Sequence, residues 1–483
     1  MRTEFKTPGV YIEEIPKLPP SIASVETAIP AFIGYTQTAK WKADNDLFMR
    51  PWRITSLLQY EQYFGFPQPE KGSLSVAFTN GGQDVNASID ETKRSKYLMY
   101  YSLQMFFANG GGPCWITSVG SYSDAGVDRD PLSKGLKEIE KINEVTLLLF
   151  PDAINVNGGT GDYYGLYTEA IAQSKDLQDR FVIMDVFHET DNATNWPLDI
   201  QNDAASPPSG LRNRISGTTD DLKYAAVYFP RIKTTLDFYF KVPNSDPPQD
   251  DDTQVKITGI AGSETLDALK KGKNKEYFQA KAAIGRLQMI LPASSAMAGL
   301  YAETDNTRGV WKAPANINIA NVDEPEFLIT DNDQQDLNVD PGAGKSVNVI
   351  RSFAGRGPAI VWGARTLAGN DNEWRYISVR RFFNMVEEST KNATQQFVFE
   401  PNDENTWVRI KSMIQNYLTQ QWKAGALMGA SIKEAFFVHV GLNETMTELD
   451  ILEGRLIIEI GMAVVRPAEF IILRFMHKML SES

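Results

Sequence analysis

The sequence predicts an α/β fold. Three short, mostly apolar runs are typical of strands that are buried on both faces of a sheet. Segments with helical spacing alternate with these runs, and such alternation favours a parallel sheet with helices packed on it. The apolar runs are Val145–Phe150, Arg180–Phe187 and Tyr224–Phe229, and the helical segments are Ser133–Asn143 and Tyr163–Leu177.

The first 30 residues are predicted to form an extended arm. Proline removes a backbone donor and opposes helix, and five prolines are spread over residues 1–30. One strand-like run, Val10–Ile15, lies in this arm, and the prolines that follow leave it without a hairpin partner. After the arm, Tyr97–Asn109 has helical spacing and ends at a glycine run before Pro113, which is a helix stop signal. The next segment, Cys114–Val119, is a predicted strand.

The second half of the chain combines a charged excursion with a regular C-terminal part. Residues 243–276 are polar and charged, and we expect them to be a surface excursion. The predicted elements beyond them are strands at Val347–Ile350 and Ala359–Trp362, helices at Trp374–Thr394 and Thr406–Trp422, and strands at Arg455–Arg466 and Phe470–Phe475, the last two separated by Pro467.

Composition excludes several classes of protein. The chain has 61 acidic and 48 basic residues, whereas a nucleic-acid-binding surface needs to be basic. Its single cysteine, Cys114, and three scattered histidines predict no disulfide and no metal centre. The N-terminus lacks the apolar segment of a signal peptide, and Leu456–Val465 is shorter than the roughly 20 apolar residues that span a bilayer. We expect a soluble protein, made in the cytoplasm, without cofactor, nucleic acid or membrane insertion.

Two loops resemble ligand-binding motifs but lack part of each pattern. Gly342–Ser346 matches the end of a phosphate-binding loop, but Val339 stands where a glycine must turn the chain around the phosphates. Asp250–Asp252 lacks the spaced ligands and the glycine of a calcium-binding EF-hand loop. A flexible loop and a solvated loop are the favoured interpretations.

The α/β layer also raises the hypothesis of a hydrolase. Gly110–Gly112 resembles the glycine run of an oxyanion hole, but the sequence contains no G-x-S-x-G nucleophile elbow, and a helix C-cap is favoured. Asp185, His188 and Ser294 are residue types of a catalytic triad, but Asp185 at a strand end is more often a helix cap or a loop residue. We predict that the chain is not an enzyme. A catalytically silent or cryptic α/β-hydrolase-like enzyme and a monomeric binding module are the alternatives.

Charged residues cluster on the predicted helix Trp374–Thr394. Arg380, Arg381 and Lys391 either lie on a solvated face and pair within the helix with Glu387 and Glu388, or contact a partner. Spacing alone favours the first interpretation.

The two ends of the chain carry the least explained pattern. Val10–Ile15 and Phe470–Phe475 are apolar strand formers near the termini, and prolines separate each from the rest. A short apolar strand needs a sheet edge to satisfy its backbone groups. It can pair within its own subunit or add to the sheet of a neighbour. The residues themselves leave both alternatives open.

Several segments resemble those of contractile tail sheath proteins. They occur in the family's order from residue 7 to about residue 473, whereas residues 35–280 resemble the family only weakly. The family includes phage tail sheaths, R-type pyocin sheaths and the sheaths of phage-tail-like contractile injection systems, and the chain resembles the last group most. The segments are Thr7–Glu14, Gly299–Asn316, Asn348–Arg351, Gly355–Gly357, Val361–Leu367, Tyr376–Arg381 and Arg466–Ile471.

This resemblance implies a structural subunit with an α+β core domain and an inserted α/β layer, similar to a subtilisin-like domain without catalytic use. The core would comprise residues 1–30 and 346–483, and residues 31–345 would face outward. Subunits would stack as helical hexameric rings around an inner tube. Contraction from a metastable extended state would drive the tube through a target envelope. The implied partners are neighbouring sheath subunits, the inner tube protein, and baseplate and terminal cap proteins, in a phage tail or phage-tail-like particle that is assembled in the bacterial cytoplasm and can be released.

The resemblance also implies three sets of site residues. In the family, the N-terminal arm of one subunit and the C-terminal strand of another add to the sheet of a third. The residues implied for strand addition are Val10, Tyr11, Ile12, Glu13, Ile15, Phe470, Ile471, Ile472, Leu473 and Phe475. The implied receiving strand contains Leu456, Ile458, Ile460, Met462 and Val464. The candidate tube contacts on the two long helices are Arg380, Arg381, Lys391, Arg409 and Lys411.

Overall fold

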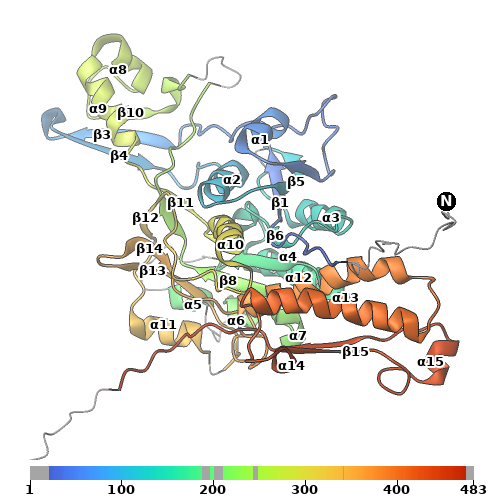
Figure 1. The fold of residues 1–483 in the computed structure, drawn as a ribbon. Helices are drawn as coiled ribbons and strands as arrows, with labels where there is room; N and C mark the ends of the chain where they lie inside the picture. Colours follow the sequence, from blue (N-terminus) through green and yellow to red (C-terminus); the bar gives the residue numbers. More distant parts are fainter. Residues whose placement is uncertain are drawn as a thin grey trace, which may run out of the picture. The chain divides into compact units, whose positions relative to one another are not determined.

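The computed structural model describes residues 21–123, 125–187, 196–200, 210–242, 249–340 and 342–474, and Figure 1 colours them along the sequence. Contacts divide the chain into two compact units. In the described ranges, unit 1 contains residues 21–25 and Val386–Val465, and unit 2 contains Glu26–Met385 and residues 466–474. No helix in these ranges combines the length and the hydropathy that crossing a membrane requires.

Unit 2 is built on an eight-stranded sheet. Its strands are β1 (Pro30–Thr36), β2 (Trp52–Ile54), β5 (Cys114–Ser121), β6 (Leu147–Leu149), β7 (Phe181–Asp185), β8 (Ala225–Phe229), β13 (Asn348–Phe353) and β14 (Gly357–Val361). They lie in the order β14-β13-β8-β7-β6-β1-β5-β2. The strands from β13 to β5 run parallel, while β14 and β2 pair antiparallel at the edges. The α/β fold that the apolar runs predict is confirmed.

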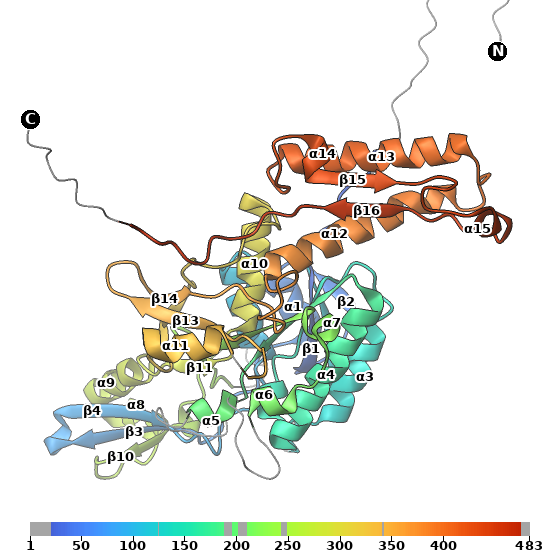
Figure 2. The ribbon, with the colours of Figure 1, turned by 90° about the horizontal axis from the view of Figure 1, so that it is seen from below.

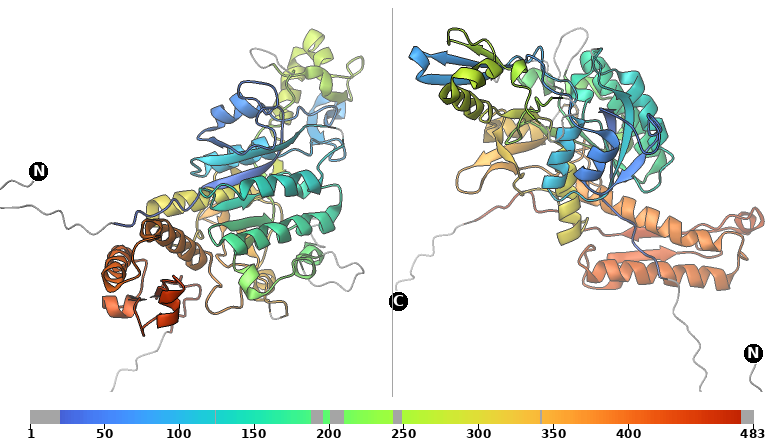
Figure 3. Two further views of the ribbon diagram at one scale, coloured as in Figure 1. Left: turned by 90° about the vertical axis from the view of Figure 1, so that its right-hand side faces the viewer. Right: turned by 90° about the horizontal axis from the view of Figure 1, so that it is seen from above.

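Helices surround this sheet, and Figure 3 shows α3 and α4 (teal and green) side by side along it. The helix predicted at Tyr97–Asn109 ends at Ala108, and Gly110 follows with a φ of 94°, in the left-handed region that glycine adopts readily. The favoured C-cap interpretation of the glycine run is therefore confirmed. The helices up to residue 338 are α1 (Leu57–Phe64), α2 (Met99–Ala108), α3 (Arg129–Ile139), α4 (Gly159–Leu177), α5 (Trp196–Ile200), α6 (Leu211–Arg214), α7 (Thr219–Leu222), α8 (Leu266–Gly272), α9 (Asn274–Ile284), α10 (Ser294–Arg308) and α11 (Asp331–Asn338).

The core of unit 2 lies on both faces of the sheet. Successive residues of a strand point to opposite sides, so each strand supplies both faces. Phe32 and Ile183 join the core that contains α2 and α10. Ile33 and Val182, their neighbours in β1 and β7, join the core that contains α3 and α4. This two-sided burial explains why the strands are continuous apolar runs.

Two small sheets extend unit 2. One contains β3 (Leu74–Thr79), β4 (Asp84–Ile89) and β10 (Lys256–Thr258), and the other contains β9 (Ile232–Thr234), β11 (Met289–Leu291) and β12 (Val322–Pro325). The predicted surface excursion at 243–276 contains regular secondary structure in its described part. β10 pairs with β3 there, and Val255, Ile257, Leu266 and Leu269 are buried. These four apolar residues are too sparse to stand out among the surrounding charges.

Unit 1 consists of helices and a two-stranded sheet, which Figure 2 shows in orange and red. Its elements are the second half of α12 (Ile377–Thr394), α13 (Glu404–Lys423), α14 (Ile432–Ala435), β15 (Phe436–His439), α15 (Glu448–Leu452) and β16 (Glu459–Met462). The predicted helix at Thr406–Trp422 corresponds to α13, whose Ile410, Ile414 and Leu418 are buried. Residues 21–25 belong to this unit, because the Val25 N–H donates to Ser389 Oγ (3.0 Å).

The structure places the domain boundaries differently from the prediction of 1–30, 31–345 and 346–483. Residues 346–385 belong to unit 2, since β13 pairs parallel with β8 and extends the main sheet. Residues 26–30 belong to unit 2 as well and lead into β1, and residues 466–474 return to unit 2 after β16. The local sequence near residue 346 does not show that β13 pairs with β8, because the two strands are far apart in the chain.

Candidate functional site: the C-terminal segment and the sheet of unit 1

The C-terminal segment predicted as a strand is not a strand in the described part of the chain. Residues 466–474 have no regular secondary structure, and Phe470, Ile471, Ile472 and Leu473 are 69–79% exposed. Pairing of this segment with its own subunit is therefore not found among the described residues. The other residues implied for strand addition, Val10, Tyr11, Ile12, Glu13, Ile15 and Phe475, lie outside those residues.

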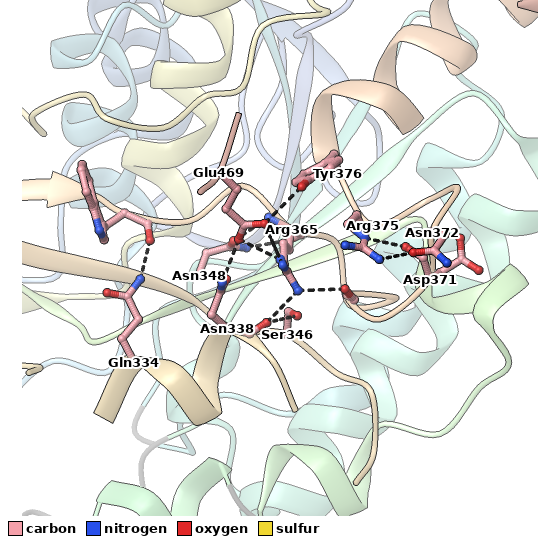
Figure 4. A network of polar contacts seen from close by, with 12 residues as sticks. Gln334, Asn338, Ser346, Asn348, Arg365, Asp371, Asn372, Arg375, Tyr376 and Glu469 are labelled. Atoms are coloured by element: carbon pink, nitrogen blue, oxygen red, sulfur yellow. Dashed lines mark hydrogen bonds and ion pairs between the residues drawn. The ribbon is translucent and has the colours of Figure 1, made fainter. Parts of the chain in front are cut away.

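One residue before the exposed segment, Glu469 is held by a polar network (Figure 4). Its carboxylate forms a bidentate ion pair with Arg365, with Nε–Oε1 at 2.9 Å and Nη2–Oε2 at 2.7 Å. The amide of Asn338 (2.7 Å) and the hydroxyl of Tyr376 (3.1 Å) donate to the same carboxylate. Burial opposes ionisation, but the hydrogen bonds and the charge of Arg365 outweigh it and lower the pKa of Glu469.

Arg365 is itself fixed in unit 2. It is 3% exposed, and its Nη1 donates to the backbone carbonyls of Asn338 (3.2 Å) and Gly369 (3.0 Å). Its backbone N–H and carbonyl bond the side-chain amide of Asn348, the first residue of β13, at 2.7 and 2.8 Å. The approach is close, because a Cβ at Gly363 would lie 2.7 Å from Asn348 Oδ1. The loop around Arg365 therefore connects Glu469 to the main sheet.

Two motifs of the sequence meet in this network. Arg365 belongs to Val361–Leu367 and Glu469 to Arg466–Ile471, and 104 residues separate the pair. Both segments stand out by resemblance, but their contact is missed by sequence reasoning. The only available signal is the presence of an arginine in one motif and a glutamate in the other.

The sheet of unit 1 presents open edges. β15 and β16 pair antiparallel, from Phe436 opposite Met462 to His439 opposite Glu459. Within the described ranges, neither strand has a second strand as a partner. Each strand therefore has one edge whose backbone groups another strand can pair with.

The predicted receiving strand overlaps β16 only in part. Ile460 and Met462 lie in β16, and Leu456 and Ile458 precede it. Val464 forms an isolated bridge with Leu427. The five predicted residues are half-buried or buried, whereas Ile457 and Glu459 between them are exposed, as the period of two requires.

Two of the five candidate tube contacts are buried, and the prediction of a surface contact is wrong for them. Arg380 is 2% and Arg381 is 4% exposed. Arg381 pairs with Asp305 (Nη1–Oδ1 3.0 Å). Arg380 donates to Asn384 (2.7 Å), and its guanidinium lies 4.5 Å from the ring centre of Trp374. The sequence does not show that the first half of α12 lies inside unit 2, where ion pairing and aromatic stacking compensate for the buried charge.

The other three candidates lie on the helices of unit 1. Lys391 pairs with Glu388 (3.0 Å) three residues earlier, as the intrahelical alternative predicts. Lys411 lies 3.5 Å from Glu444, and Arg409 is exposed. All three remain candidates for a contact with a partner.

Asp185, at the end of β7, caps a helix. Its Oδ1 accepts the backbone N–H groups of Ala293 (2.8 Å) and Ser294 (3.0 Å) at the start of α10. Burial raises the pKa of Asp185 to about 6, against the opposing effect of these bonds. The favoured interpretation as a helix cap is confirmed. His188, the base of the triad hypothesis, lies outside the described residues.

Replacing Asp185 by Asn is expected to flatten the pH dependence of stability. The folded-state pKa of about 6 lies above the ordinary 3.8, so the folded chain binds more protons between these values and the free energy of unfolding falls as pH rises. This contribution is fully present below about pH 4 and lost above about pH 6. An uncharged amide oxygen can accept both N–H groups, so Asp185→Asn should lack this decline of roughly 2–3 kcal/mol. Urea unfolding at acidic and at neutral pH measures the change, and an unchanged pH dependence would contradict the assignment.

The loop that resembles a phosphate-binding motif is occupied by internal contacts. Lys345 Nζ donates to the carbonyl of Arg212 (2.6 Å). The carboxylate of Asp340 accepts the N–H groups of Gly342 (3.0 Å) and Ala343 (2.9 Å). The lysine and these amides, which would bind phosphates in a true motif, therefore already have protein partners.

The aspartate run also has internal partners. Asp252 accepts from Lys270 (3.3 Å) and from the hydroxyl of Tyr277 (3.1 Å), and Asp250 pairs with Lys281. In the part of the chain that the structure describes, no group of three or more His, Cys, Asp or Glu side chains is placed to hold a metal ion.

Comparisons with known proteins point in the same direction as the motifs. Residues 369–477 match the model of the phage tail sheath C-terminal domain. The tail sheath protein of Vibrio phage KVP40 is 31% identical over 129 residues, which cover 27% of this chain and 19% of that protein. The tail sheath protein of Burkholderia phage BcepMu is 29% identical over 147 residues, which cover 29% of this chain and 30% of that protein. The matched part thus spans less than a third of each of these relatives.

Solved structures extend the similarity over the whole chain. The helical sheath of the anti-feeding prophage (AFP) in its contracted state is 31% identical, with a TM-score of 0.63 and coverage of 98% of this chain and 100% of that chain. The PVC sheath complex of an extracellular contractile injection system, also contracted, is 28% identical, with a TM-score of 0.61 and coverage of 99% of both chains. A chain in the contracted AFP baseplate is 25% identical, with a TM-score of 0.65 and coverage of 98% and 99%. The chain belongs to the family of contractile tail sheath proteins.

Proposed function

We propose that this sheath subunit polymerises by strand exchange between copies. The observation that supports this most directly is the exposed apolar segment Phe470–Leu473 in a chain whose sheet β15–β16 has open edges. Strand addition would bury the apolar side chains and pair the open backbone groups in one step. Val10–Ile15 would supply the second strand from another copy.

Contraction in this proposal is a rigid-body change between two arrangements of subunits. Copies stack as helical hexameric rings in a metastable extended state and pass to a contracted state, in which the free energy of the subunit contacts is lower. Backbone ladders from exchanged strands keep the copies connected while the units rotate. No fuel is hydrolysed, since the energy is stored during assembly.

The partners follow from the same proposal. An inner tube protein would contact the exposed charges of Lys391 and Arg409 and the partly exposed charge of Lys411, which bind weakly and can release. Baseplate and terminal cap proteins would bind the ends of the sheath, and the similarity to a chain in the AFP baseplate supports the first of these. The particle would assemble in the bacterial cytoplasm and act after release.

Two other functions are less well supported. A hydrolase-like enzyme needs a nucleophile, a base and an oxyanion site, but Asp185 and the glycine run at 110–112 serve as helix caps. A monomeric binding module would not account for the similarity of nearly the whole chain to sheath chains in contracted assemblies. We therefore propose that the chain has no catalytic role.

Deleting residues 1–15 is expected to leave a folded subunit that does not polymerise. The described fold of both units begins after this segment, so its removal should leave the cores intact. The polymer would lose one of its two exchanged strands. Circular dichroism measures the fold, and electron microscopy measures tube formation. Tubes of parental length from the deletion would contradict the proposal.

A further inference from the structure

We infer that the Glu469–Arg365 ion pair is the anchor from which the C-terminal segment is presented to a neighbouring copy, which makes Glu469 a positioning residue for assembly. The inference rests on the proposed strand exchange and adds to it the point where the donated strand is attached to its own subunit. Figure 4 shows this pair at the centre of its network.

The path of the chain singles out Glu469. The Val465 N–H still donates to the carbonyl of Ala426 (3.1 Å) in unit 1. Pro467 then has no N–H and cannot continue a ladder. Among described residues 466–474, Glu469 is the one whose side chain forms hydrogen bonds with the rest of unit 2, and the exposed apolar residues follow directly.

The pair is built to hold the chain at one place. Arg365 presents a planar fork that matches a carboxylate, so the two parallel bonds fix both position and orientation. The side chain of Glu469 has 20% of its surface exposed and that of Arg365 only 3%. Removing the carboxylate would take away Glu469 Oε2, to which Arg365 Nη2 donates. The positive charge of Arg365 would then be buried without a counter-charge from Glu469.

The anchor lowers the conformational entropy that is lost in strand exchange, and it determines which units of two copies the exchanged strand connects. With Glu469 fixed, the free segment begins at Phe470 and not at Arg466, so fewer backbone residues lose freedom when the strand pairs. The anchor belongs to unit 2, whereas the open sheet belongs to unit 1. Each exchanged C-terminal strand would therefore connect unit 2 of one copy to unit 1 of another. The ion pair would attach this strand to unit 2 of its own copy.

Glu469→Gln tests the anchor. It keeps the shape of the side chain and removes the charge, so the subunit concentration needed for tube growth should rise roughly tenfold or more. Tyr376→Phe removes a single donor and should raise this concentration less. A spin label at Ala468→Cys should become more mobile in the Glu469→Gln background. The label is specific, because the native Cys114 is buried.

A matched control is Glu140→Gln, which removes one exposed carboxylate from the C-terminal end of α3 and should change neither measurement. The inference is overturned if Glu469→Gln assembles at the parental concentration, or if the label keeps its parental mobility. It is also overturned if the variant melts earlier but assembles normally once folded, which is the behaviour of a purely structural pair. Normal assembly after deletion of residues 470–483 would contradict the strand exchange itself. If the 470–483 deletion variant does not assemble but Glu469→Gln assembles normally, the role of Glu469 as an anchor is contradicted and strand exchange is not.

Discussion

Deletion of residues 470–483 is expected to abolish tube assembly and leave the subunit folded. The exposed side chains of Phe470, Ile471, Ile472 and Leu473 contribute little to the core of their own chain. The shortened chain ends at Glu469, so the ion pair with Arg365 is retained. In the polymer, every copy would lose the strand that it donates. Sedimentation and electron microscopy measure assembly, and circular dichroism and thermal melting measure the fold.

Two substitutions test whether this segment acts by forming a strand. Ile471→Pro removes a backbone N–H and should block assembly almost as strongly as the deletion, because a proline interrupts a ladder. Ile472→Val keeps a β-branched apolar side chain and should assemble like the parent. A deletion variant that forms tubes in normal yield would show that residues 470–483 are not the connecting strand.

Asp305→Ala is expected to lower the free energy of unfolding by roughly 3–5 kcal/mol, as found when one partner of a buried ion pair is removed. The Asp305 side chain is 5% exposed and accepts from Arg381 and from the hydroxyl of Thr27 (2.6 Å). Without it, the Arg381 guanidinium would keep the Thr27 carbonyl (2.9 Å) and the ring of Tyr301 (4.6 Å) but no counter-charge. Urea unfolding measures the loss.

The control for this prediction is an exposed ion pair. Asp331 pairs with Arg351 at 2.6 Å, but its side chain is 88% exposed. Water and salt screen such pairs, so Asp331→Ala should cost at most about 1 kcal/mol. Equal losses in the two variants would contradict the role of Arg381 as a buried, paired charge and would reopen its assignment to the surface.

The parallel sheet could be predicted because burial on both faces produces continuous apolar runs. β6, β7 and β8 each lie inside a predicted run. The starts of the helices are predicted less exactly. The pattern suggests that α4 begins at Tyr163, but it begins at Gly159, because its first turn contains glycine and polar residues that hide the helical pattern. β10 escapes prediction because a three-residue strand among charged neighbours has too few positions to show a period.

The candidate site also has features that the sequence indicates and contacts that it does not. The apolar pattern of Phe470–Leu473 indicates a strand former, and its exposure is consistent with a partner outside the subunit. The pairs Arg365–Glu469 and Arg381–Asp305 join residues that are far apart in sequence. A charged residue in a predicted helix gives no indication of such a partner, so Arg381 is placed on the surface by sequence reasoning although it is buried.

Cysteine cross-linking tests strand exchange most directly. Cysteines introduced along Phe470–Leu473 would be paired with cysteines along β15 and β16, such as Phe437→Cys, and assembled particles would be oxidised. Cys114 is fully buried, and burial raises the pKa of its thiol, so it should not compete. Strand exchange predicts covalent ladders of several chains at the registers that face one another. Single chains at every register, or cross-links within one chain only, would contradict it.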